Sequence, residues 1–248
     1  MSERFFVAPP IAGDFAELRG DEARHLAATM RARSGDEVVV FDGSGAEFRA
    51  RVLSVGKSSV KLEIIERGEI SRELPRPVTL AVALPKGERQ KWLIEKATEL
   101  GVSRIIPLVT EHGVAQPTEQ AIERLRRGVI EASKQCGRNR LMDIGVPQSA
   151  IEFFAAPAEK SACRLIGQPR GEPLTAAPTN APAVIAAIGP EGGFSSAEMA
   201  AAQAAGWRGV SLGPAILRLE TAAIAFAAWA AATGFSVDGG LPDRKSSD

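Results

Sequence analysis

The stretch Ala183–Glu198, AVIAAIGPEGGFSSAE, joins an apolar run to a glycine loop and then to a predicted helix start. Its first six residues are apolar, as in a strand that is buried in a parallel sheet. Three glycines follow within five residues, and Ser195 and Glu198 have the spacing of a capping box. Glycine permits backbone conformations closed to other residues, and a helix start offers free N–H groups to a ligand. The stretch is therefore either a ligand-binding loop or a plain strand-to-helix turn.

A second glycine loop follows the next apolar run. It reads LGPAILRLET over Leu212–Thr221, where Gly213 and Pro214 predict a sharp turn into a helix. Arg218 and Glu220 lie among apolar or small neighbours, and buried charges are costly unless they are paired. They form either a structural ion pair or a charged site. Two glycine loops after consecutive strands favour the site.

Strands and helices alternate on both sides of these loops. Apolar runs predict strands at 78–84, 104–109, 163–166, 183–188 and 209–212. Helices are predicted at 88–100, 119–135, 149–156, 196–205 and 216–233. This alternation predicts an α/β fold with a parallel sheet covered by helices on both faces, in which ligands bind at the carboxyl ends of the strands.

The first seventy residues have a different pattern. A short amphipathic segment at 21–33 precedes three β-rich runs at 37–41, 46–55 and 60–66, which are joined by tight turns. Such short strands predict a small β-barrel. The charged, proline-containing stretch 71–77 marks the boundary. We therefore predict an N-terminal barrel domain at 1–72, an α/β domain at 73–236, and a disordered tail at 237–248.

The charge balance excludes attraction of nucleic acid to the whole surface. Thirty Lys and Arg residues oppose thirty Asp and Glu residues, so any RNA contact must come from a local patch. One basic stretch contains a single acidic residue, Glu131, and six cations: Arg124, Arg126, Arg127, Lys134, Arg138 and Arg140. It is either a solvated helix face or a phosphate-binding surface.

Other classes of protein are not expected. Two cysteines, Cys136 and Cys163, make no disulfide framework, and with only His25 and His112 in addition we predict no metal site. Charges near the start and the absence of a long apolar run predict neither a secretory signal nor a membrane span. We expect a cytoplasmic protein.

Four motifs together resemble one family. They are KGERQKWLIEKATELGV (86–102), KQCGRNR (134–140), IGPEGGFSSAE (188–198) and LGPAILRLETA (212–222). In this order and spacing the chain resembles, over nearly its whole length, the RsmE family of 16S ribosomal RNA (uracil-N3)-methyltransferases in the SPOUT superfamily. The resemblance implies a PUA-like RNA-binding barrel, a SPOUT domain with a deep trefoil knot, a homodimer, and S-adenosylmethionine (SAM) bound in the knot.

The resemblance also implies the reaction, which is methylation of N3 of a specific uridine at the decoding centre of 16S rRNA, on the assembled 30S subunit. Uracil N3 carries a proton and lies on the pairing edge, so the base must be unpaired and its developing anion stabilised. Two alternatives remain open. One is a SPOUT methyltransferase for another RNA position, and the other is a non-catalytic RNA-binding or ribosome-assembly protein that retains the fold.

We predict three sets of site residues. The first is implied by the resemblance on the matching positions, the second is chosen by residue type and loop position, and the third by positive charge. Those expected to bind the cofactor are Ile166, Gly167, Gly189, Pro190, Glu191, Gly192, Gly193, Leu212, Gly213, Ile216 and Leu217. The candidate catalytic residues are Arg138 and Arg218 as cations, and Glu191 and Glu220 as proton acceptors or as groups that orient an arginine. Those expected to contact RNA are Arg4, Arg31, Lys86, Arg89, Arg124, Arg127, Lys134, Arg138 and Arg140.

The chain departs from the family pattern at two cations. Ala215 and His112 stand where an arginine is usual. A guanidinium recognises phosphate in a way that neither residue does, and histidine is cationic only at lower pH. These departures bear on substrate affinity more than on the fold.

Overall fold

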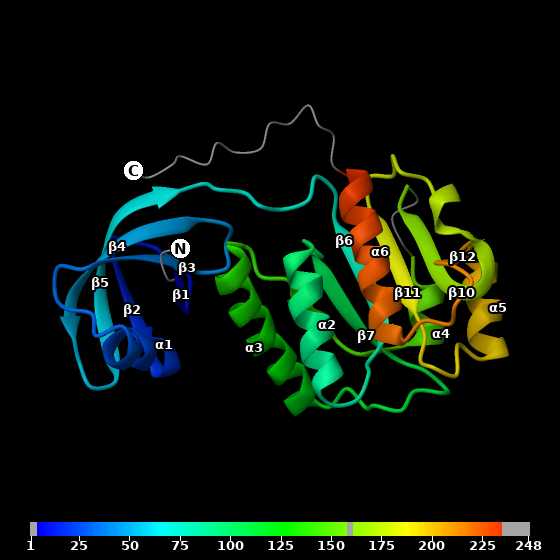
Figure 1. Cartoon of the computed structure of the whole chain (residues 1–248), viewed down its shortest axis with the longest axis horizontal. Coiled ribbons are helices and arrows are strands. Elements are labelled where there is room, and N and C mark those ends of the chain that lie inside the picture. Colours follow the sequence, from blue (N-terminus) through cyan, green and yellow to red (C-terminus); the bar gives the residue numbers. More distant parts are fainter. Residues whose placement is uncertain (1–3, 158–160, 235–248) are drawn as a thin grey trace. The chain divides into compact units, whose positions relative to one another are not determined.

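The computed structural model describes residues 4–157 and 161–234 (Figure 1). The chain forms two compact units, one of residues 1–73 and 123–143, and one of residues 74–122 and 144–248. The sequence placed segment 123–143 in the second domain, whereas its packing groups it with the N-terminal residues. The predicted tail at 237–248 lies outside the described residues.

The first unit contains a five-stranded sheet in the order β1-β3-β4-β5-β2. Its strands are β1 (Arg4–Phe6), β2 (Phe15–Arg19), β3 (Glu37–Phe41), β4 (Glu47–Val55) and β5 (Ser59–Gly68). The three predicted runs are confirmed as the antiparallel strands β3, β4 and β5. The short strands β1 and β2 were not predicted. The amphipathic segment forms α1 (Gly20–Arg24), which continues as a π-helical turn, His25–Thr29.

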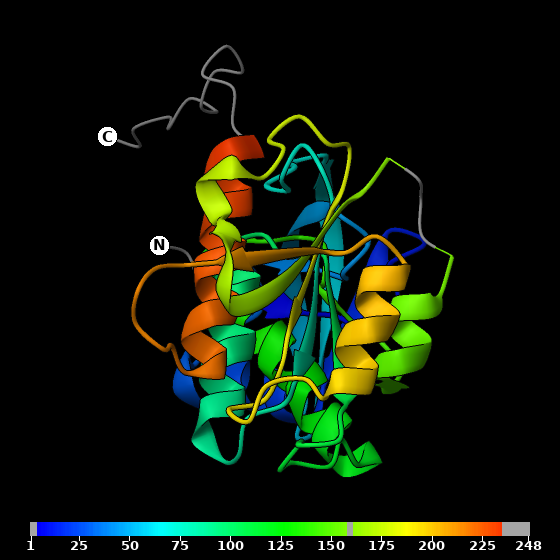
Figure 2. The same cartoon turned by 90° about the vertical axis from the view of Figure 1, so that its right-hand side faces the viewer.

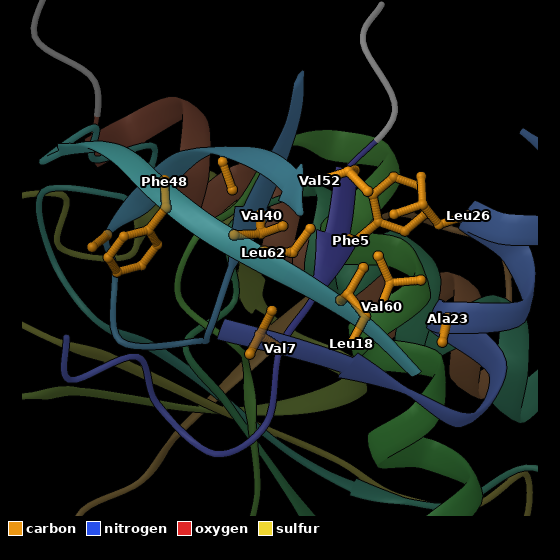
Figure 3. Close-up of a cluster of buried hydrophobic side chains, with 12 residues drawn as sticks. Phe5, Val7, Leu18, Ala23, Leu26, Val40, Phe48, Val52, Val60 and Leu62 are labelled. Carbon is orange, nitrogen blue, oxygen red and sulfur yellow. The ribbon is translucent and has the colours of Figure 1, made fainter. Parts of the chain in front are cut away.

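Alternating burial explains why these residues form a half-buried sheet. Along β4, Phe48, Ala50 and Val52 are buried, whereas the arginines between them, Arg49 and Arg51, are exposed. Successive side chains of a strand point to opposite faces, so the sequence period of two places one row in the core. Figure 3 shows this core, where side chains from β1, β2, β3, β4 and β5 meet those of α1 and the π-helical turn.

Segment 123–143 joins this unit through polar contacts. The Arg138 guanidinium donates from Nε to Glu73 Oε1 at 3.0 Å, and the Asn139 amide donates to the Ile70 carbonyl at 2.9 Å. The Gly45 N–H donates to the Asn139 carbonyl at 3.1 Å. Arg138 and Asn139 are buried, and buried polar groups are costly unless they are satisfied, so these contacts fix the segment in the first unit.

The second unit has a seven-stranded sheet in the order β12-β10-β11-β6-β7-β8, with β9 paired to β7. The strands are β6 (Val78–Ala83), β7 (Arg104–Val109), β8 (Asp143–Ile144), β9 (Gln148–Ser149), β10 (Cys163–Pro173), β11 (Val184–Ile188) and β12 (Arg208–Ser211). The pairs that join β12, β10, β11, β6 and β7 are all parallel. The predicted parallel α/β sheet is therefore confirmed.

Helices cover both faces of this sheet (Figure 2). The helices α2 (Glu88–Glu99) and α6 (Leu219–Gly234) pack together on one face, and α4 (Ala150–Ala155) and α5 (Ser196–Ala204) pack together on the other. Helix α3 (Glu119–Cys136) begins in this unit and continues into the first, and a short 3-10 helix, Leu174–Ala176, follows β10. Among the helices that the structure describes, none combines the length and apolar character of a membrane span.

Two predicted boundaries differ most from the structure. Strand β10 was predicted to end at Ile166, but it extends to Pro173 with a register shift between Gly167 and Glu172. The reason is a close backbone approach, because a Cβ at Gly171 would lie 2.6 Å from the Val210 backbone. Helix α6 begins at Leu219 rather than Ile216, because the turn that starts at Gly213 extends further along the chain. The trefoil knot stays a prediction.

The packing of α2 makes a testable prediction. Leu93 is fully buried, whereas Lys91 on the same helix is exposed. Leu93→Ala should lower the free energy of unfolding by about 2–5 kcal/mol, because it removes apolar contacts and leaves a cavity. Lys91→Ala should change it by at most about 0.5 kcal/mol. Urea unfolding followed by circular dichroism measures both variants, and equal effects would contradict the assigned face of α2.

Candidate functional site

A cavity of about 520 Å³ lies in the second unit, where part of a strand and two loops meet at the carboxyl edge of the sheet. Its volume is typical of a site for a small molecule. The segment that begins at Gly167 in β10, the loop after β11 and the loop after β12 form its walls. The lining residues are Gly167, Gln168, Pro169, Ile188, Gly189, Pro190, Glu191, Gly192, Gly193, Phe194, Val210, Ser211, Leu212, Gly213, Ala215, Ile216, Leu217, Arg218, Leu219 and Ala222.

The loop after β11 is a closed turn that leads into α5. The Gly193 N–H donates to the Pro190 carbonyl at 2.8 Å, and Gly193 has a φ of 73°, a conformation that favours glycine. The predicted capping box is confirmed. The Ser195 N–H donates to Glu198 Oε2 at 2.7 Å, and the Glu198 N–H donates to Ser195 Oγ at 3.4 Å.

The loop after β12 presents apolar side chains to solvent. Ile216 is 87 % exposed and Leu217 is 36 % exposed, although both line the cavity. The helix that follows, α6, is held in place from its first residues, because Leu219 and Glu220 are buried. An apolar loop that is open to solvent beside a cavity is suited to close against a ligand.

Charged residues from three elements meet at the cavity wall. Arg89 on α2 places Nη1 3.1 Å from Glu191 Oε1 and 3.6 Å from Glu220 Oε2. Glu220 is 6 % exposed, and Arg89 provides the positive charge that its burial requires. The sequence left open whether Arg218 and Glu220 form an ion pair with each other or a charged site. In the structure Glu220 pairs with Arg89 instead.

The carboxyl of Glu191 is stabilised in its charged form. A hydrogen bond from its own backbone N–H, and then the nearby Arg89 guanidinium, hold the pKa of Glu191 below its usual value. At neutral pH this side chain is therefore an anion with little tendency to take up a proton.

The loop between β7 and α3 supports the β11 loop from outside the cavity. The Glu111 N–H donates to Glu198 Oε1 at 2.9 Å, and His112 Nδ1 lies 3.1 Å from the Gly193 carbonyl oxygen. The sequence did not predict these contacts. They join segments that are more than eighty residues apart, and no local pattern reports such a contact.

Most residues predicted for the cofactor come together. All of them except Ile166, which is buried directly before Gly167, line the cavity. The lining residues that were not predicted include Gln168, Pro169, Ile188, Phe194, Val210, Ser211, Leu219 and Ala222. The only sequence feature that could have identified these residues is that they lie next to the predicted loops.

The predicted catalytic residues divide between the two units. Glu191 and Arg218 line the cavity, and Glu220 lies beside Leu219 and is paired with Arg89. Arg138 belongs to the first unit, where it is 3 % exposed and ion-paired with Glu73. In the described residues no group of three or more His, Cys, Asp and Glu side chains is placed to hold a metal ion.

The residues predicted to contact RNA differ in exposure. Arg4 is paired with Glu47 at 2.8 Å, with a side chain only 10 % exposed, and Lys134 is paired with Glu22 at 2.7 Å. Arg138 is buried. The exposed members of the set are Arg31, Arg124, Arg127 and Arg140 in the first unit and Lys86 in the second, where Arg89 is half-buried.

Two family models match the chain. Residues 72–231 match an RNA methyltransferase domain, and residues 18–65 match an RNA methyltransferase PUA domain. Ribosomal RNA small subunit methyltransferase E from Synechocystis sp. is 35 % identical over 228 residues, which cover 90 % of this chain and 75 % of the relative. The protein of the same name from Bacillus subtilis is 31 % identical, covering 83 % of this chain and 85 % of the relative.

A solved structure with the same fold contains a cofactor. Ribosomal RNA small subunit methyltransferase E from Neisseria gonorrhoeae, bound to S-adenosyl methionine, superposes with a TM-score of 0.84 at 28 % identity, covering 92 % of this chain and 96 % of that one. The predicted PUA domain and α/β methyltransferase domain are thus both matched. The chain belongs to the ribosomal RNA small subunit methyltransferase E family.

Proposed function

We propose that this chain is a SAM-dependent rRNA methyltransferase whose cofactor binds in the cavity formed by Gly167–Pro169, Gly189–Phe194 and the loop after β12. The observation that carries the proposal is this cavity, with glycine loops at the carboxyl edge of a parallel sheet, in a chain of this family. The relative from Neisseria gonorrhoeae was solved with SAM bound.

The lining of the cavity suits SAM. Apolar side chains, among them Ile188, Phe194, Val210 and Leu219, offer a surface for the adenosine. The glycine-containing segments expose backbone N–H and C=O groups, which provide the few directed hydrogen bonds that such a ligand needs. Glu191 and Arg218 supply charges of both signs for the amino-acid end of the cofactor. When bound, SAM supplies a methyl group activated by its sulfonium.

The acceptor we propose is N3 of a uridine. This nitrogen carries a proton and lies on the pairing edge, so the base must leave its helix to be methylated. The N3 proton is released to solvent water as the N–CH3 bond forms, and a cation beside the base stabilises the negative charge that develops on it. Arg218 is our first candidate because it lines the cavity and is exposed. Arg138 is a second candidate, and it would have to act while paired with Glu73.

Glu191 and Glu220 are better suited to orient arginines than to accept the proton. A general base works best with a pKa near the operating pH, and the pKa of Glu191 is lowered. Glu220 is buried and paired with Arg89. We therefore propose that these carboxylates hold Arg89, and that Glu191 also attracts the Arg218 guanidinium.

The substrate we propose is a specific uridine at the decoding centre of 16S rRNA, presented by the assembled 30S subunit to a cytoplasmic homodimer. Exposed arginines such as Arg124, Arg127 and Arg140 supply the positive charge for the phosphates. Another RNA position is the main alternative, because the cavity does not encode the RNA sequence. A non-catalytic protein with this fold is disfavoured, because it would have no need of an intact cofactor cavity.

The direct test is to incubate the purified protein with labelled SAM and with 30S subunits or free 16S rRNA that lack the modification. We expect label in 3-methyluridine at one decoding-centre nucleotide, and faster labelling of the 30S subunit. Label at a different nucleotide would favour the alternative substrate. SAM binding without transfer to either RNA would favour the non-catalytic protein.

Filling the cavity should block the cofactor. Ala222 lines the cavity on the first turns of α6, whereas Ala228 on the same helix is exposed and lies outside the cavity. Ala222→Leu should reduce SAM affinity by at least about tenfold, because the added side chain occupies space that the ligand needs. Ala228→Leu should bind SAM as the unchanged chain does. Isothermal titration measures both, and equal affinities would place the cofactor elsewhere.

Arg218→Ala should separate chemistry from cofactor binding. We expect methyl transfer to fall by about 100-fold or more, which is typical for removal of a group that stabilises transition-state charge. SAM affinity should change little. Arg208 is a matched control, because its side chain is also accessible, at 42 % exposed, and it lies in this unit but outside the cavity. A wild-type rate for Arg218→Ala would refute the assigned role.

A further inference from the structure

Gly193 on the cavity wall has both of its backbone polar groups bonded. Its N–H donates to the Pro190 carbonyl at 2.8 Å, within the β11 loop. Its carbonyl oxygen lies 3.1 Å from Nδ1 of His112, which belongs to the loop between β7 and α3. His112 is not among the residues that line the cavity, so it contacts Gly193 from the side that faces away from the cavity.

His112 is presented on a tight turn. The Gly113 N–H donates to the Thr110 carbonyl at 3.1 Å, which closes the turn around the histidine. The next residue back, Glu111, donates its N–H to the Glu198 carboxylate at 2.9 Å. That carboxylate also caps α5 through Ser195. The position of His112 is thus fixed independently of its own side-chain hydrogen bond.

The His112 side chain also packs against the neighbouring glycine. A Cβ built on Gly192 would lie 3.1 Å from the His112 Cβ, so there is no spare space between them. A carbonyl oxygen only accepts hydrogen bonds, so Nδ1 of His112 must carry a proton. The imidazole therefore donates to the loop from its solvent-exposed outer side.

We propose that His112 is a positioning residue of the cofactor site, which holds the Gly192–Gly193 segment in the conformation that the ligand requires. This inference rests on the proposed function. A loop with three glycines has many accessible conformations. If the free loop is not already ordered, part of the binding free energy of the ligand is lost in ordering it. By fixing the Gly193 carbonyl from outside, His112 raises cofactor affinity without touching the cofactor.

The experiment compares three variants of the full chain. His112→Ala removes the donor, and His112→Asn restores an N–H close to the position of Nδ1. Val114→Ala is the matched control, because Val114 lies on the same loop, is 51 % exposed and has a side chain that cannot donate a hydrogen bond. Two readouts are used, namely hydrogen exchange of residues 189–195 without ligand, and titration with SAM.

We expect His112→Ala to exchange about fivefold faster at residues 189–195 and to bind SAM about fivefold more weakly, the effect of losing one hydrogen bond. The KM for SAM should rise while kcat at saturating SAM stays unchanged. His112→Asn should restore most of both effects, and Val114→Ala should resemble the unchanged chain.

Unchanged exchange in His112→Ala, or no rescue by His112→Asn, would overturn the positioning role. Failure of the unchanged chain to bind SAM would instead contradict the proposed function. Since the exchange measurement needs no ligand, the two failures are distinguishable.

Discussion

The site depends on one constraint, which is that part of its wall is a glycine-rich loop whose path has to be set by groups outside that loop. The β11 loop has three glycines and few side chains to fix its path. Its conformation is set by an internal turn, by the capping box at Glu198, and by the loop that carries His112. Arg89 on α2 adds a link between Glu191 and Glu220, so the β11 loop and the start of α6 are tied to the same helix.

The same contacts set the electrostatics of the cavity. Arg89 and Arg218 oppose the two carboxylates, Glu191 and Glu220, and leave the local charge balanced. A balanced pair of charges beside an apolar lining suits a ligand that carries both signs at one end and an aromatic base at the other. Removing Arg89 would leave the buried Glu220 carboxylate without its countercharge, which is costly in a low-dielectric interior.

Sequence periodicity predicted most of the strands. A strand buried on one face has alternating apolar residues in its sequence, and a strand buried on both faces has a continuous apolar run. Strands β3 and β7 have the predicted bounds. Gly171 shows the limit, since its role is to let β10 approach the Val210 backbone, and no local pattern distinguishes that from a loop. The cavity residues were predicted from glycine loops and family resemblance. The Arg89 and His112 contacts were not, because they join residues that lie 102 and 81 positions apart in the sequence.

A crystal structure of the full chain grown with the cofactor product, S-adenosylhomocysteine, would show whether the cavity between the glycine loops holds SAM. We expect the ligand against Gly189–Gly193 and Leu212–Leu217, with the His112 contact to Gly193 retained. A ligand bound elsewhere, or a cavity closed by Ile216 and Leu217 without ligand at saturating concentration, would contradict this expectation.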